Sequence, residues 1–308
     1  MNNKVLLIIL VALLAIFGLS KFFSGNDDSS FNPEFIKVDK EAVTKVVLHS
    51  KADNQEEVTL NKTEDGWTLS KNGNTYPAAT EAVDNLLVQL ASVKTNYIAA
   101  KNADKWTEYE LNADQASQIT VYGGSNILAD FYIGKFSVNQ QAQQITSFFR
   151  VADKDDVYAV IGMAGMMLGQ GSNSYRNKKL LSLNFSDIES LNFEGDKVYQ
   201  VSKTTEGQWI SDNNIAVDTS KAKNYIMNLL SMSGETFVDF DENLNNDKLL
   251  KKLTITGSNM EEPVLVRCWR DDAAEKPFII QSSQYPQSYF SSDSTRLFTR
   301  LFKGIEEW

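Results

Sequence analysis

One amphipathic pattern occurs twice in this chain, and this repetition restricts the fold more than any other feature of the sequence. The two segments are TEAVDNLLVQLAS at residues 80–92 and TSKAKNYIMNLLS at residues 219–231. In both, apolar residues recur three and four positions apart, which predicts a helix with one buried face. The predicted buried positions are Val83, Leu86, Leu87 and Leu90 in the first helix and Ala222, Tyr225, Ile226 and Leu229 in the second.

Segments with strand-like alternation precede each of these helices in the same order. They are VTKVVLHS, EEVTLNKT and GWTLSKNGNTYPA before the first helix, and IESLNFEG, KVYQVSKT and GQWISDNNIAVD before the second. Alternation of apolar and polar residues predicts half-buried strands, and the Asn-Gly pair at 72–73 predicts a tight hairpin turn. Trp67 and Trp209 take the same place in the two copies.

The correspondence continues after each helix. NYIAA corresponds to TFVDF, ITVYGGSNILADFYIGK to LTITGSNMEEPVLVRCWR, SFFRVADKDDVYAV to PFIIQSSQYPQSYF, and SYRNKKLL to STRLFTRLF, where we expect a short terminal helix. We therefore predict an α+β fold after an N-terminal membrane helix: two tandem, similar units of mostly antiparallel sheet, each covered by an amphipathic helix. The predicted boundaries are 1–24 for a membrane anchor or signal segment, 25–39 for a linker, 40–183 for the first repeat and 184–308 for the second.

The N-terminal segment has the pattern of a membrane helix or a signal peptide. Lys4 precedes the apolar run VLLIILVALLAIFGL, and Phe22 and Phe23 extend this run toward the roughly 20 residues that a membrane span needs. With Lys4 on the cytoplasmic side, we expect a single-pass protein of the bacterial inner membrane with the bulk of the chain in the periplasm. The alternative is a signal segment cleaved after Ser20, which would export the same remainder.

Charge and cysteine content exclude several classes of function. The formal net charge of -10 repels nucleic acid and anionic lipid headgroups, so we expect no nucleic-acid partner. Cys268 is the only cysteine, which excludes an internal disulfide. Its apolar surroundings in VLVRCW predict a buried, inert thiol.

The sequence contains no pattern that indicates catalysis, a metal site or a cofactor. His49 is the only histidine, and its position in VTKVVLHS, opposite in parity to Leu48, predicts an exposed strand residue. A Ser-x-x-Lys pattern at 220–223 is explained by helix capping, with Thr219 or Ser220 as the N-cap residue. We therefore predict no catalytic residue, no metal site and no cofactor.

The segment GMAGMMLGQGSNS at 162–174 combines three methionines and four glycines without a charged residue. We expect a short buried helix followed by a loop. The segment is also the first candidate for a partner contact through Met163, Met166 and Met167, because methionine adapts to irregular surfaces and the second copy has no comparable stretch.

Several motifs resemble a bacterial family described as domain of unknown function 4340. They are GWTLS, YPAATEAVDNLLVQL, YELNADQASQITVYGG, FYIGK, FRVADKDDVYAV and YRNKKLLSLNFSDIESLNF. The resemblance implies a single-span, envelope-facing protein associated with ABC-type transport systems of the gliding-motility kind, and it implies no catalytic residues. This chain has Tyr109-Glu110-Leu111 where the family commonly has Tyr-Gly-Leu. Because glutamate adopts a positive φ less readily than glycine, the local turn is expected to differ.

Together these features predict a non-enzymatic, membrane-tethered extracytoplasmic accessory or scaffold protein for a transport or envelope assembly. Its expected partners are the membrane, through the N-terminal helix, and envelope or transporter proteins. The alternative is a module that binds an envelope glycan or peptide in a cleft between the two repeats. In that case Trp106, Trp269 and Tyr285 would stack against the ligand.

Overall fold

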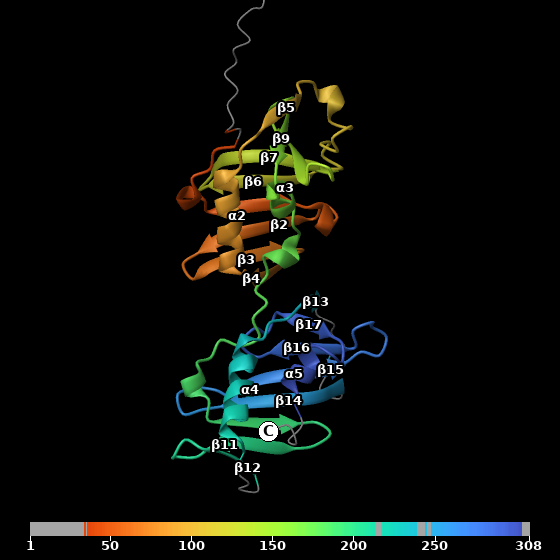
Figure 1. Ribbon diagram of the computed structural model, residues 1–308. Helices are drawn as coiled ribbons and strands as arrows, with labels where there is room; N and C mark the ends of the chain where they lie inside the picture. The colour runs from red at the N-terminus through yellow and green to blue at the C-terminus, as the bar shows by residue number, and fades with distance from the viewer. Residues whose placement is uncertain (1–33, 35, 213–216, 239–243, 245–247, 304–308) are drawn as a thin grey trace, which may run out of the picture. The chain divides into compact units, whose positions relative to one another are not determined.

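Two antiparallel sheets make up the core of the protein, as the computed structural model in Figure 1 shows. The structure describes residues 34, 36–212, 217–238, 244 and 248–303. The first sheet has nine strands and the second has eight, with few helices. This arrangement confirms the predicted α+β class with mostly antiparallel sheet.

The first sheet has the strand order β4-β3-β2-β1-β6-β7-β8-β9-β5. Helix α2 (Thr80–Ser92) lies between β4 and β5 in the chain, and the short helix α3 (Ala164–Leu168) follows β9. The strands are β1 (Lys45–His49), β2 (Glu57–Thr63), β3 (Gly66–Lys71), β4 (Asn74–Pro77), β5 (Tyr97–Ala100), β6 (Ser117–Gly123), β7 (Asn126–Asn139), β8 (Gln144–Val151) and β9 (Val157–Ile161).

The second sheet has the strand order β12-β11-β10-β14-β15-β16-β17-β13. Helix α4 (Thr219–Ser231) lies between β12 and β13 in the chain, and α5 (Leu297–Leu301) follows β17. The strands are β10 (Ser190–Glu194), β11 (Tyr199–Lys203), β12 (Trp209–Ser211), β13 (Thr236–Val238), β14 (Leu249–Thr256), β15 (Val264–Arg270), β16 (Phe278–Ser282) and β17 (Tyr289–Ser292).

The two sheets repeat one topology. In the first sheet, the order β3-β2-β1-β6-β7-β8-β9-β5 corresponds strand by strand to β12-β11-β10-β14-β15-β16-β17-β13 in the second. Trp67 on β3 and Trp209 on β12 are both buried at the corresponding position. This agreement confirms the repeated architecture, whereas the boundary between residues 183 and 184 stays a prediction.

The two long helices occupy the two segments in which the sequence pattern predicts them. All eight apolar positions predicted to face inward are buried. The α4 residues pack in one cluster with Leu191, Trp209 and Ile255 of the second sheet, and Figure 1 shows α4 lying across that sheet. The predicted cap is wrong: the N-cap is Asp218, whose carboxylate accepts hydrogen bonds from the backbone N–H groups of Ser220 and Lys221. A carboxylate is favoured here because it faces the positive end of the helix dipole.

The Asn-Gly hairpin turn is confirmed, but the terminal helix is found in one copy only. Asn72 and Gly73 both have positive φ, 51° and 76°, as a tight turn between β3 and β4 requires. Helix α5 forms at the end of the second copy, whereas residues 175–177 of the first copy bond to the backbone around β4. The polar Asn177-Lys178 stands where α5 begins with Leu297-Phe298, so the first copy lacks an apolar helix face at this place.

No helix among the described residues is long and apolar enough to span a membrane. The predicted membrane segment, residues 1–24, lies outside the described residues. The membrane anchor is therefore still a prediction from the sequence.

Glutamate was expected to avoid a positive φ at this turn, but Glu110 adopts the left-handed conformation with a φ of 55°. The Leu111 N–H bonds to the carbonyl oxygen of Trp106 at 2.9 Å, and the Lys135 N–H bonds to the carbonyl oxygen of Tyr109 at 2.9 Å. A Cβ atom at Gly134 would lie 2.1 Å from that same Tyr109 oxygen, so β7 packs directly against the turn. The neighbouring contacts thus hold a conformation that glutamate adopts at a cost of about 1 kcal/mol.

Replacing Glu110 with glycine is expected to give a protein about 1 kcal/mol more stable than replacing it with alanine. Both variants lose the exposed ion pair between Glu110 and Lys51, whose N–O distance is 2.8 Å, so their difference isolates the backbone conformation. Chemical denaturation of the two variants measures this difference. An alanine variant at least as stable as the glycine variant would contradict a strained turn.

Candidate functional site

The methionines of the uncharged segment lie on the outer side of α3. Met163, Met166 and Met167 are 49%, 41% and 40% exposed, whereas Gly165 and Leu168 are buried. The expected short helix is present, but its methionines face solvent, so the expectation of a buried helix is wrong for these side chains. The five-residue helix turns only Gly165 and Leu168 inward, which leaves the methionines on its outer side.

Gly165 lets α3 approach the sheet closely. A Cβ atom at Gly165 would lie 2.3 Å from the Cβ and Oγ atoms of Ser147 on β8 and 3.2 Å from the ring of Phe136 on β7. No larger residue fits without moving the helix, because atoms this close overlap. The contact places α3 over the β7–β8 hairpin, beside Phe136.

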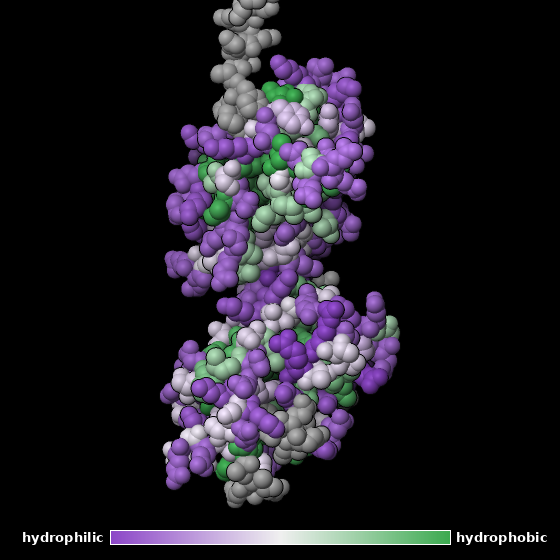
Figure 2. Space-filling model, in the orientation of Figure 1, coloured by the Kyte–Doolittle hydropathy of each residue, from purple (hydrophilic) through white to green (hydrophobic). Residues whose placement is uncertain are grey.

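Two exposed apolar residues of β7 adjoin α3. Phe136 is 44% exposed and Val138 is 63% exposed. Phe136 pairs with Ser147 and Val138 pairs with Ile145, so both project from the sheet face that α3 covers. We call the set Phe136, Val138, Met163, Met166 and Met167 the methionine face. Figure 2 shows hydrophobic atoms gathered at the position of α3 in Figure 1.

The methionine face lies within two uncharged stretches of sequence. Residues 136–149 and 157–175 contain no Asp, Glu, Lys or Arg, although 23% of the whole chain is charged. The fold brings these stretches together, because β8 pairs with both β7 and β9. An uncharged apolar surface on an acidic protein is typical of a binding site for another protein. Sequence reasoning identified the methionines but missed Phe136 and Val138, which the absence of charge in 136–149 could have indicated.

Trp106, one of the predicted ligand-stacking residues, is already stacked within the protein. The guanidinium carbon of Arg150 lies 3.9 Å from the Trp106 ring centroid and 4.0 Å from that of Tyr132. The Trp106 Nε1 also donates to the carbonyl oxygen of Asp155 at 3.0 Å. Arg150 is buried, and this burial lowers its pKa. One face of the indole therefore serves the internal packing.

The other two predicted stacking residues lie elsewhere in the fold. Trp269 on β15 is buried, with its ring centroid 6.2 Å from that of Tyr289. Tyr285 lies half-buried in the loop between β16 and β17. Both belong to the compact unit that includes the residues after Gly171, whereas Trp106 belongs to the unit that includes Leu86–Gln170. Ligand stacking by these rings stays a prediction.

His49 and Cys268 have the surroundings of structural residues. His49 is half-buried rather than exposed, and its Nδ1 lies 3.1 Å from the carbonyl oxygen of Gln55. Cys268 is buried as predicted, and burial raises the pKa of its thiol to about 12. Among the described residues no group of three or more His, Cys, Asp or Glu side chains is placed to hold a metal ion.

Cys268 is expected to resist maleimide in the native protein at every pH from about 7 to 9, because only the thiolate reacts rapidly. With a pKa of about 12, the thiolate is a very small fraction throughout this range. Mass spectrometry should find the thiol unmodified before denaturation and fully labelled in guanidinium. Labelling of the folded protein that rises with pH would show that the thiol is accessible.

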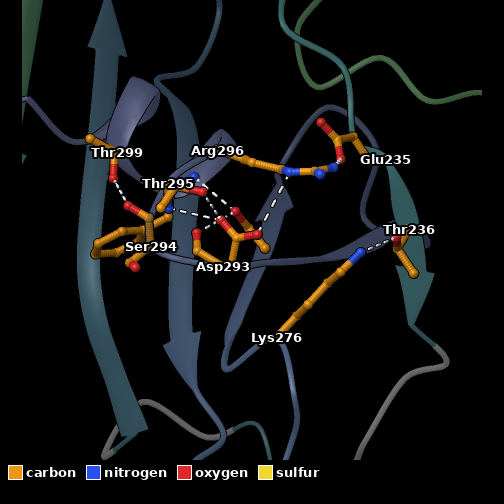
Figure 3. Close-up of polar contacts among 10 residues, drawn as sticks. Glu235, Thr236, Lys276, Asp293, Ser294, Thr295, Arg296 and Thr299 are labelled. Carbon is orange, nitrogen blue, oxygen red and sulfur yellow. Dashed lines mark hydrogen bonds and ion pairs between the residues drawn. The ribbon is translucent and has the colours of Figure 1, made fainter.

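A charged network joins β13 to the segment before α5 (Figure 3). Arg296 pairs with Glu235 and, at 3.6 Å, with Asp293. The hydroxyl and backbone N–H of Thr295 both donate to Asp293 at 2.8 Å and lower the pKa of its carboxyl group. The carboxylate of Glu235 is exposed and that of Asp293 is half-buried, and both are bonded to partners within the network, which is typical of a structural link rather than of acid–base catalysis.

Comparison with known proteins gives a family and no close relative. The family model for the domain of unknown function DUF4340 matches residues 67–252, more than half of the 308-residue chain. No curated protein and no solved structure matches the chain. The resemblance seen in the sequence motifs is thereby confirmed.

Proposed function

The chain belongs to the DUF4340 family, and we propose that it is a non-enzymatic, membrane-tethered extracytoplasmic accessory or scaffold protein for a transport or envelope assembly. The observation that carries this proposal is the methionine face. Its five apolar side chains are 40–63% exposed and lie in sequence stretches without a charged residue. Such a surface is best explained by a protein partner that covers it.

The methionine face can supply part of the binding free energy for such a partner. Fully burying one side chain of this size contributes about 1.5–3 kcal/mol, so covering five half-exposed side chains contributes several kcal/mol. Association costs about 4–15 kcal/mol because the two proteins lose translational and rotational freedom. The face is therefore an anchor point that other contacts with the same partner must supplement.

Three further observations support the other parts of the proposal. His49 bonds to backbone and Cys268 is a buried thiol, so neither is presented as a catalytic group. The apolar run after Lys4 supplies the tether and the extracytoplasmic placement of the remainder. The net charge of -10 favours a protein partner over nucleic acid or an anionic membrane surface.

The proposal is tested by cross-linking the full-length protein in its native membranes from a single engineered cysteine. Met166→Cys carries a benzophenone maleimide on the methionine face, and Met227→Cys carries it on α4. Met227 is a matched control because it is also an exposed helical methionine, at 52% against 41% for Met166. The native Cys268 does not interfere because it is buried.

We expect Met166→Cys to give reproducible adducts with the same transport or envelope protein, identified by mass spectrometry of the linked peptides. Met227→Cys should give few or none. If the two positions give the same adducts in similar yield, or if a well-folded protein gives none, the methionine face is not a partner surface and the proposal fails.

A further inference from the structure

The end of β7 is an open strand edge beside the methionine face. Pairing between β6 and β7 stops at Ser117 and Ile133, whereas β7 continues to Asn139. Residues 136–139 pair with β8 on one side only, within the part of the chain that the structure describes. The β7–β8 hairpin thus extends beyond the end of β6 (Figure 1).

The hydrogen-bond pattern shows which backbone groups face outward. The Gly162 N–H donates to the carbonyl oxygen of Ile145 at 2.8 Å, so the backbone groups of Ile145 point toward β9 and away from β7. Ile145 and Val138 are therefore a non-hydrogen-bonded pair, and the N–H and C=O groups of Val138 point away from β8. The same applies to Phe136, two residues earlier and paired with Ser147.

Neither a charged residue nor a proline protects this edge against pairing. Open strand edges are normally blocked by charged residues or proline, or are very short. The outermost strand β4 follows this rule, since it ends at Pro77. Residues 136–149 contain no proline and no charged residue, and Phe136 and Val138 expose apolar side chains next to their outward backbone groups. This edge can therefore pair with another strand.

We propose that the β7 edge at residues 136–139 binds an extended segment of the partner protein by strand addition. The segment would exchange backbone hydrogen bonds with Phe136 and Val138, and every second side chain would lie beside Phe136 and the methionines of α3. Because the surrounding stretches are uncharged, the segment has apolar residues at alternate positions and no charge. This inference rests on the proposed function and names the partner element that the methionine face accepts.

Two substitutions at one position separate strand addition from simple apolar contact. Val138→Pro removes the outward N–H but keeps the pairing with β8, because that N–H does not bond to β8. Val138→Thr keeps the N–H and the β-branched shape. Each is combined with Met166→Cys and its benzophenone group in the full-length protein, and the adduct yield is measured in native membranes. Unchanged melting temperatures establish that both variants fold.

We expect Val138→Pro to lower the adduct yield about tenfold, the factor that corresponds to one lost hydrogen bond of about 1.4 kcal/mol. Val138→Thr should lower the yield less than about threefold. Equal yields from both variants would overturn strand addition and leave the proposed function standing. Adducts of the chain with itself would overturn the partner segment in favour of a second copy.

Amide hydrogen exchange gives a second readout that does not depend on cross-linking. The amides of Phe136 and Val138 are expected to exchange at least about tenfold more slowly in native membranes than in the purified full-length protein. Equal rates in the two preparations would show that no strand covers the edge, and would overturn the inference even if Met166→Cys gives adducts.

Discussion

Replacing Leu90 or Leu229 with alanine is expected to lower the free energy of unfolding by about 2–5 kcal/mol in each case. Both side chains are fully buried, at the same position of α2 and of α4. Truncation removes apolar contacts and leaves a cavity between the helix and the sheet. The surrounding structure relaxes into this cavity only partly. Denaturant titration followed by circular dichroism measures the loss.

The matched controls are Val88→Ala and Met227→Ala, which also occupy one position of the two helices. Val88 is 46% exposed and Met227 is 52% exposed, so each substitution is expected to change stability by less than about 0.5 kcal/mol. The four variants together test whether the helices bury equivalent faces. A loss at Val88 as large as that at Leu90 would contradict the arrangement described here.

The fold was largely predictable because its strongest signals are local and periodic. The spacing of apolar residues predicted both long helices, and the Asn-Gly pair predicted the β3–β4 turn. Features that depend on distant contacts were not predictable. The helix cap at Asp218 required a choice among adjacent polar residues, and the left-handed Glu110 is held by the contact between Tyr109 and Lys135.

The candidate site was predictable only in part. The composition of 162–174 identified the methionines, but which side of a five-residue helix faces the sheet depends on Gly165 and its contact with Ser147. The open edge at Phe136 and Val138 depends on where β6 ends relative to β7, which no pattern within β7 indicates. The exposure of a residue at a strand edge depends on the neighbouring strands and not on the segment itself. It could therefore be read only from the pairing of β7 with β6 and β8.

Replacing Arg150 with lysine is expected to lower the free energy of unfolding by about 2–4 kcal/mol, although the charge is conserved. Arg150 lies between the rings of Trp106 and Tyr132. Its Nε and Nη2 both donate to the carbonyl oxygen of Leu111, at 3.4 and 3.3 Å, and its Nη1 donates to that of Ala152 at 3.2 Å. Lysine has no planar group to stack and cannot make the paired bond to Leu111. Thermal and denaturant unfolding measure the effect.

The matched control for this prediction is Arg270→Lys, because Arg270 is exposed and its ion pair with Asp272 lies at the surface. We expect a change below about 0.5 kcal/mol there. If Arg150→Lys is as mild as the control, the guanidinium is not needed between the rings, and Trp106 is again a candidate for ligand stacking. If Arg150→Lys is destabilising as expected, the Trp106 indole is needed to hold the turn before Leu111 against β8. That result favours partner binding through the methionine face over ligand stacking through Trp106.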